Sequence, residues 1–187
     1  MATKIMKFKG RSGYAMLYKP DEFMEKVFWK INLYPDDGEI DRMKHAGIKQ
    51  AKNAKDDDGE KSGVSGKYVT LKRDTEKKFK GKLEEFNPPW IKDKDGAYLV
   101  HYQDDGERVG EPILIGNGST IEVEVEVYDA PPYGKGCRLR GVKVIDLIEY
   151  IPPEEVSENE ADEEPEPEPE PEPKKEEKAP VKKKVRW

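Results

Sequence analysis

The sequence predicts a mainly β protein: a small, closed or nearly closed β-barrel with one short helix and extended loops. Apolar and polar residues alternate in several short segments, Gly- and Asp-rich turns separate these segments, and a single stretch has helical spacing. An immunoglobulin-like sandwich is the structural alternative, but it accounts less well for the interposed helix. At 187 residues the chain fits one domain with an appendage better than two full domains.

The strands are predicted from period-two alternation. The clearest covers 120–128, where apolar β-branched residues face one side and three glutamates the other, directly after the turn at 116–118. The closing strand, 137–150, changes its apolar phase around Gly141, which predicts a bulge or a bend there. The other strands are expected at 13–19, 27–34, 67–73 and 97–103.

One helix is expected over residues 39–54, where apolar and small residues recur at helical spacing and Gly47 weakens the pattern. Residues 55–66, KDDDGEKSGVSG, have the composition of a flexible loop. The segment 87–90 contains two prolines, which cannot donate to a ladder, so it is not expected in the middle of a sheet.

Composition divides the chain after position 153. Residues 154–187 hold 13 acidic and 7 basic residues, which accounts for the whole net charge of −6. Residues 164–173 alternate Glu and Pro, and such a segment cannot bury enough apolar surface to offset its ordering entropy. We therefore expect a folded domain over 1–153 and a disordered Glu/Pro-rich acidic tail with a basic end over 154–187.

Within the folded domain the charges balance in number but not in position. Residues 1–82 hold 20 basic and 13 acidic residues, whereas 83–153 hold 7 basic and 14 acidic. A basic front half can supply a local binding field, because salt limits the reach of exposed charge to about 10 Å. Mixed charges that merely keep a small domain soluble could give the same distribution, so the aromatic residues are needed to distinguish the two interpretations.

The sequence offers little for catalysis or metal binding. His45 and His101 have no evident nucleophile partner of the triad kind, and 56–59 lacks the ligand spacing of a calcium loop. The glycine-rich turn at 116–119 lacks the lysine and the following helix of a phosphate loop. The single cysteine, Cys137, excludes an internal disulfide and is expected to be a buried thiol. We expect no catalytic residue, no metal and no cofactor.

Nucleic-acid binding accounts better for the front half, because its aromatic and basic residues are interleaved. Proteins that bind single strands combine a positive groove with aromatic faces that stack on bases, at ~1–3 kcal/mol per base. Over 27–34, alternation places Trp29 toward the core and Phe28 and Tyr34 on the polar face, where a ligand could reach them. The residues expected to contact DNA are Tyr14, Tyr18, Phe28, Lys30, Tyr34, Tyr68, Lys72, Arg73, Lys77, Lys78, Trp90, Tyr102, Arg138 and Arg140.

Several segments together carry a resemblance to a known family. In chain order they are FNPPWIKDKDG, AYLVHYQ, IGNGST, IEVEVEVY and RLRGVKVIDLIEY, followed by an acidic tail that ends in an aromatic residue. In these segments the chain resembles the phage-encoded replication single-stranded DNA-binding proteins, which have an oligonucleotide/oligosaccharide-binding (OB) fold. The resemblance implies an OB-type barrel, no enzymatic activity, and a groove that binds and protects single-stranded DNA during replication, recombination and repair.

The resemblance also implies that the acidic tail recruits replication or recombination proteins and competes with DNA for the groove. Glu166, Glu168, Glu170 and Trp187 would then be its partner-binding residues. A tail of this family is expected to stay acidic to its end, whereas here a basic run, 182–186, precedes Trp187.

Localisation and alternative functions are the remaining expectations. No segment approaches the ~20 apolar residues of a membrane span, and we expect a cytoplasmic protein, in the host cell if it is phage-encoded. One alternative is a phage component whose β-domain binds protein and whose tail is a spacer. Another is a nuclease or recombination accessory. The sequence indicates no oligomeric state.

Overall fold

The computed structural model describes residues 3–79, 81–102, 107–110, 113–130, 132 and 134–151. The chain divides into two units, Met1–Ile151 and Pro152–Trp187. The second unit, which contains the predicted partner-binding residues Glu166, Glu168, Glu170 and Trp187, lies outside the described residues.

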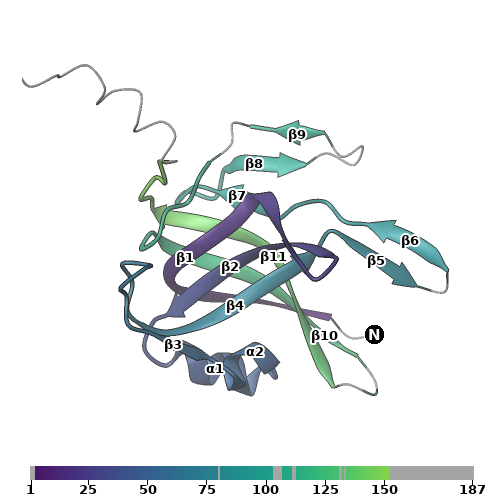
Figure 1. Cartoon of the computed structure of the whole chain (residues 1–187), viewed down its shortest axis with the longest axis horizontal. Coiled ribbons are helices and arrows are strands. Elements are labelled where there is room, and N and C mark those ends of the chain that lie inside the picture. The colour runs from purple at the N-terminus through teal and green to yellow at the C-terminus, as the bar shows by residue number, and fades with distance from the viewer. Residues whose placement is uncertain are drawn as a thin grey trace, which may run out of the picture. The chain divides into compact units, whose positions relative to one another are not determined.

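The prediction of a mainly β protein is confirmed, with two short helices between strands (Figure 1). Nine strands form one sheet in the order β3-β4-β2-β1-β10-β11-β7-β8-β9, and β5 and β6 pair separately. The elements are β1 (Thr3–Phe23), β2 (Lys26–Pro35), α1 (Glu39–His45), α2 (Lys49–Lys52), β3 (Lys55–Asp57), β4 (Gly66–Asp74), β5 (Glu76–Phe79), β6 (Lys82–Glu85), β7 (Trp90–Lys92), β8 (Tyr98–Tyr102), β9 (Arg108–Val109), β10 (Thr120–Asp129) and β11 (Lys135–Asp146).

The sheet curls but does not close into the expected barrel. The end of β4 approaches β11, where Arg73 Nη1 donates a hydrogen bond to the carbonyl of Leu139 at 3.3 Å. Among the described strands no ladder joins β4 to β11. The reason is that β7 takes part of the free edge of β11, pairing with it in parallel from Gly141 opposite Trp90. An inserted strand thus occupies the position at which closure would occur.

The strongest predicted strand is confirmed as β10, which pairs with β1 on one side and β11 on the other. Its apolar residues, Ile121, Val123, Val125 and Val127, are buried in the core. Its glutamates face outward, as the alternation predicts.

The predicted irregularity at Gly141 is also confirmed. Glu124 pairs with Gly141 but the next residue, Val125, pairs with Leu139, so Arg140 is the extra residue of a β-bulge. A Cβ atom at Gly141 would lie 2.1 Å from Cδ2 of Trp90. Glycine is required here because the indole ring packs directly on the backbone of β11.

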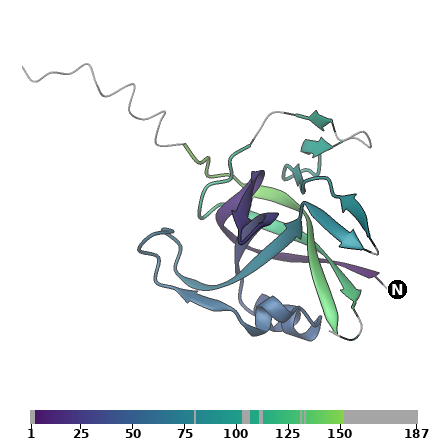
Figure 2. The same ribbon diagram turned by 45° about the vertical axis from the view of Figure 1, so that its right-hand side comes forward.

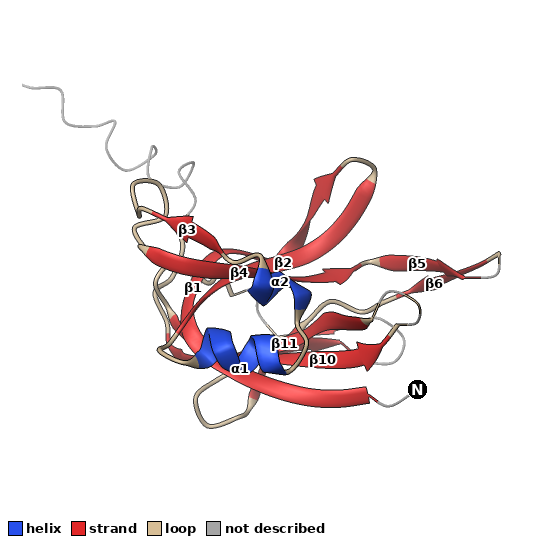
Figure 3. Ribbon diagram, turned by 90° about the horizontal axis from the view of Figure 1, so that it is seen from below, coloured by secondary structure: helices blue, strands red, loops and turns tan. Residues whose placement is uncertain are grey.

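The single helix expected over 39–54 is in fact two short helices. Gly47, with φ +86°, adopts the left-handed conformation that typically ends a helix, so α1 stops before it and α2 starts after it. Met43, Ile48 and Ala51 from this region enter the hydrophobic core. Seen from below, both helices lie across the open end of the curled sheet (Figure 3).

Residues 55–66 were expected to be a loop, but their first three residues form β3, which pairs with β4. The turn that follows is organised by the Asp57 carboxylate, which accepts hydrogen bonds from the Gly59 N–H and the Ser62 hydroxyl, both at 2.9 Å. The local side-chain bonds of an Asx-type turn fix this segment, and composition alone does not reveal them.

Strands β5 to β9 are additions to the curled centre. These strands lie apart from α1 and α2 in Figure 1 and also in Figure 2, where the molecule is turned by 45° about the vertical axis. In the described part of the chain, no helix is long and apolar enough to cross a membrane.

Candidate nucleic-acid interface

The outer face of β2 and β4 forms a groove against α2. Paired residues such as Lys30 and Lys72, or Asn32 and Thr70, project outward, because Ile31 and its alternate neighbours fill the core. The groove has a volume of about 660 Å³. We call it the lysine groove; it is lined by Lys30, Asn32, Lys49, Gln50, Asn53, Lys55, Tyr68, Thr70 and Lys72.

The lining of the lysine groove carries an excess of basic over acidic side chains. Four lysines line it and, among the described residues, no Asp or Glu does. Lys30 forms an ion pair with Asp21 of β1, which fixes its position at the groove wall. The Thr70 hydroxyl donates to Asn32 Oδ1 at 2.7 Å, so the polar floor is ordered across the two strands.

The exposure expected for Phe28 and Tyr34 is wrong, because their side chains are only 5% and 3% exposed. Lys72 covers Phe28, with Nζ 3.9 Å from the ring centroid. Tyr34 lies beneath Tyr68, whose ring centroid is 5.4 Å away, and against Gly13. The outer face of β2 is therefore itself covered, so alternation alone does not predict exposure. The expected core position of Trp29 is confirmed at 6% exposure.

Tyr34 and Tyr68 have different roles in the groove. The Tyr34 hydroxyl donates to the Asp57 carboxylate at 2.5 Å. Burial and this bond raise the pKa of Tyr34 to about 12, while the bond lowers the pKa of Asp57. Tyr34 thus supports the half-buried Tyr68, which is the aromatic residue lining the groove.

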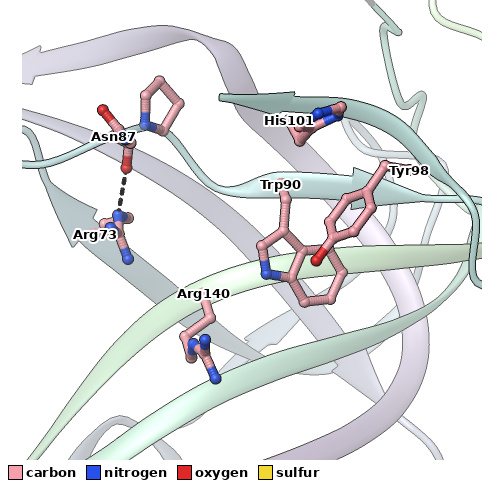
Figure 4. Close-up of a pocket in the computed structure, with 7 residues that line it drawn as sticks. Arg73, Asn87, Trp90, Tyr98, His101 and Arg140 are labelled. Carbon is pink, nitrogen blue, oxygen red and sulfur yellow. Dashed lines mark hydrogen bonds between the residues drawn. The ribbon is translucent and has the colours of Figure 1, made fainter. Parts of the chain in front are cut away.

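A second, smaller pocket of about 350 Å³ lies where the end of β4, the connection before β7, β7, β8 and β11 come together. Figure 4 shows its side chains. We call it the aromatic–arginine pocket; it is lined by Arg73, Asn87, Pro88, Trp90, Tyr98, His101 and Arg140.

The aromatic side of this pocket is a packed corner. The indole of Trp90 lies on Gly141 and meets Tyr98 in a T-shaped contact, with centroids 6.1 Å apart and planes at 87°. The ring centroid of His101 is 5.1 Å from that of Tyr98. Lys92 Nζ lies 4.5 Å and 4.3 Å from the Trp90 and Tyr98 centroids. Tyr98 nevertheless remains 53% exposed.

The basic side of the pocket consists of arginines held by hydrogen bonds. Arg73 Nε donates to the Asn87 carbonyl at 2.6 Å, and Arg140 pairs with Glu124 at 3.2 Å. Arg138 lies beside them, with its guanidinium carbon 4.5 Å from the Phe86 centroid. Burial, followed by the charge of Arg138, lowers the pKa of Arg73. The charge of Glu126 acts in the opposite direction, and that of Arg140 adds to the lowering.

The structure brings six of the predicted DNA-contacting residues into these two sites, three in each. Lys30, Tyr68 and Lys72 line the lysine groove, whereas Arg73, Trp90 and Arg140 line the aromatic–arginine pocket.

Other predicted residues lie elsewhere. Tyr14 donates its backbone N–H to Asn117 Oδ1 at 2.7 Å, and Tyr18 lies under Arg108 at 4.8 Å; neither tyrosine lines the groove or the pocket. Lys77 belongs to β5, in the separate β5–β6 hairpin. The side chains of Lys78 and Tyr102 lie outside the described residues.

The residues predicted to contact DNA do not include Lys49 and Lys55 of the groove or Tyr98 and His101 of the pocket. The two lysines were visible as polar positions near the expected helix. Period-two alternation could not group Tyr98 with His101, because residues three apart point to opposite faces of a regular strand.

The described residues contain no group of three or more His, Cys, Asp and Glu side chains placed to hold a metal ion. Cys137 is half-buried against the core, and burial raises the pKa of its thiol to about 12. A thiol of this kind is a structural residue at neutral pH.

The sequence matches no protein-family model and no curated protein. Among solved structures, the chain is similar to gp2.5, a single-stranded DNA binding protein encoded by bacteriophage T7, with 18% sequence identity and a TM-score of 0.48. The similarity covers 87% of this chain and 97% of that one.

Proposed function

We propose that this protein binds single-stranded DNA with little sequence preference and catalyses no reaction on it. The observation that carries the proposal is the lysine groove: four lysines and a tyrosine, with no acidic residue among its described lining, on the outer face of β2 and β4. If the three-residue edge strand β3 is set aside, these are the second and third strands of the curled centre in chain order. The corresponding face of an OB-type fold binds oligonucleotides or oligosaccharides.

The charge of the groove favours an oligonucleotide over an oligosaccharide. Lysines neutralise phosphates and release condensed counterions, which stabilises a polyanion but contributes nothing for a neutral sugar chain. The aromatic rings at Tyr68 and Tyr98 favour unpaired bases, since stacking requires a base face that a duplex does not expose. Phosphate neutralisation and base stacking do not depend on base sequence, so we expect weak sequence preference.

The test is titration of the full-length protein against fluorescent oligo-dT and against duplex of equal length, at several salt concentrations. We expect preference for oligo-dT and a slope of log affinity against log salt of roughly −3, if about four phosphates are neutralised on a single strand. Equal affinity for duplex, or no binding at low salt, would contradict the proposal.

The cellular role is a further part of the proposal. We propose that the protein acts in the cytoplasm, during phage replication, recombination or repair, and that the acidic tail recruits partner proteins. Residues 154–173 contain 11 acidic residues and no basic ones, which supports a role in binding basic partners. Truncation after Pro153 tests the tail: partner capture should be lost while oligo-dT binding persists, and retained capture would contradict this part.

A further inference from the structure

We infer that the aromatic–arginine pocket is a binding site for one unpaired nucleotide, with its phosphate on Arg73 and Arg140 and its base against Tyr98. The inference rests on the proposed function in one respect, namely that the nucleotide belongs to the bound strand. It assigns the pocket a ligand that the lysine groove does not hold.

Three nitrogen donors surround the phosphate side of the pocket. Figure 4 shows the Trp90 indole nitrogen on the side of the ring nearer Arg73 and Arg140. The hydrogen bonds of Arg73 to the Asn87 and Leu139 carbonyls use Nε and Nη1, and the ion pair of Arg140 uses Nη1, so each guanidinium has an Nη2 outside these contacts. Arginine is suited to phosphate because its planar fork presents several donors at once.

The electrostatics of the pocket favour an anion. Burial lowers the pKa of Arg73, the charges of Arg138 and Arg140 lower it further, and Glu126 acts in the opposite direction. A phosphate bound between Arg73 and Arg140 would offset the repulsion between their two guanidinium groups. No described Asp or Glu lines the pocket, although Glu124 holds Arg140 from outside it.

The base side is provided by Tyr98 rather than by Trp90. Lys92 lies over both rings, but Trp90 also packs on the Gly141 backbone and is half-buried. Tyr98 is 53% exposed and is held by the edge-on contact with Trp90 and by His101. A ring fixed in this way loses little freedom when a base stacks on it.

The pocket and the lysine groove meet at the end of β4. Lys72 lines the groove and Arg73, the next residue of β4, lines the pocket, so the two sites lie on opposite faces of that strand. The two sites share no lining residue, so their contributions can be separated by mutation. The volume of about 350 Å³ lies at the small end of the range of ligand pockets and suits a single nucleotide better than a peptide segment.

The direct test is ¹⁹F NMR of full-length protein labelled with 5-fluorotryptophan, titrated to about 10 mM with dTMP, thymidine or inorganic phosphate; this range covers millimolar dissociation constants. The protein has three tryptophans, and Trp90→Phe assigns the pocket signal. We expect dTMP to shift the Trp90 signal at lower concentration than either fragment and to leave the signal of buried Trp29 in place. Equal effects of phosphate and dTMP would overturn the base contact, and equal effects of thymidine and dTMP would overturn the phosphate contact.

Matched variants define the residues. Tyr98→Ala should weaken dTMP binding at least fivefold, whereas Tyr98→Phe, which keeps the ring, should restore it. Arg140→Gln should also weaken dTMP binding at least fivefold, while Arg42→Gln should not, although Arg42 is likewise paired with a glutamate, at 2.9 Å. An unchanged Trp29 signal shows that each variant is folded. Wild-type dTMP affinity in both Tyr98→Ala and Arg140→Gln would overturn the inference.

A variant of the lysine groove distinguishes failure of this inference from failure of the proposed function. Lys55→Gln should weaken oligo-dT binding and leave dTMP binding unchanged. If oligo-dT binds through the groove but dTMP leaves Trp90 unaffected, the nucleotide site is wrong and the proposed function stands. If dTMP binds at Trp90 but oligo-dT does not bind, the proposed function is wrong and the pocket remains a nucleotide site.

Discussion

The lysine groove and the aromatic–arginine pocket lie on neighbouring residues of β4 but are built in different ways. The groove is a product of regular pairing: alternate residues of β2 and β4 project from one face, and the short α2 provides the other wall. The pocket arises where regular pairing fails, at the bulge before Gly141 and at the short parallel pairing of β7 with β11. The groove provides charge along a strand, whereas the pocket provides rings and guanidinium groups at one point.

Because they are built differently, the groove and the pocket should differ in how well they tolerate substitution. A groove of separate lysines should lose affinity gradually, since each lysine acts largely through its own charge. A pocket that depends on one glycine and one indole should be lost in a single step, because Trp90 has no alternative position if the Gly141 backbone is covered.

The largest effect is expected from truncating a buried aromatic residue beneath Lys72. Phe28→Ala should lower the free energy of unfolding by about 3–5 kcal/mol, because Phe28 is only 5% exposed and its loss leaves a cavity under Lys72. Trp29→Ala, on the core side of the same strand, should have a comparable effect. Urea denaturation measures both, and a Phe28→Ala protein of wild-type stability would show that Phe28 is not packed.

Reversing the groove charge should have the next largest effect. Lys55→Glu with Lys72→Glu should weaken oligo-dT binding roughly 100-fold or more at low salt, since each reversal replaces an attraction of about 1 kcal/mol by a repulsion. Fluorescence anisotropy measures the affinity, and melting confirms the fold. Lys44→Glu is the control, because Lys44 is an exposed lysine paired with Asp41 outside both sites. Equal losses in the control would indicate a diffuse charge effect.

Gly141→Ala should break the pocket and spare the groove. The added methyl would meet the indole of Trp90 at 2.1 Å, so we expect a loss of about 1–3 kcal/mol of stability and a displaced Trp90 signal. Gly38→Ala is the matched control, because φ is +80° there and nothing lies within 4 Å of the added atom. It should cost stability through backbone strain but leave Trp90 in place. A Trp90 signal that moves equally in both variants would contradict the packing argument.

The smallest effect is expected from the hydrogen bond that Tyr34, which packs against Tyr68, donates to Asp57. Tyr34→Phe should lower stability by about 1 kcal/mol near pH 7. The folded pKa of Tyr34 is raised from 10.0 to about 12, so this contribution is present below pH 10 and is lost as the pH rises toward 12. The pKa of Asp57 is lowered from 3.8, so the contribution is also lost in acid. Stability of both proteins across pH tests this, and a constant difference would contradict it.

The mainly β class, the strand β10, the bulge at Gly141 and the core position of Trp29 could all be predicted from the sequence. These features are local: alternation, turn glycines and a change of apolar phase are written in consecutive residues. The sequence also predicted six of the residues that line the two sites.

Which surfaces those residues share depends on tertiary contacts between strands that are distant in the sequence. Phe28 and Tyr34 follow the alternation of β2 to its outer face, yet Lys72 and Tyr68 from β4 cover them there. Tyr98 and His101 meet Arg140 because β7 pairs in parallel with β11 and carries β8 beside it. The physical reason is that exposure and proximity depend on what packs above a residue, and that partner lies dozens of positions away in the chain.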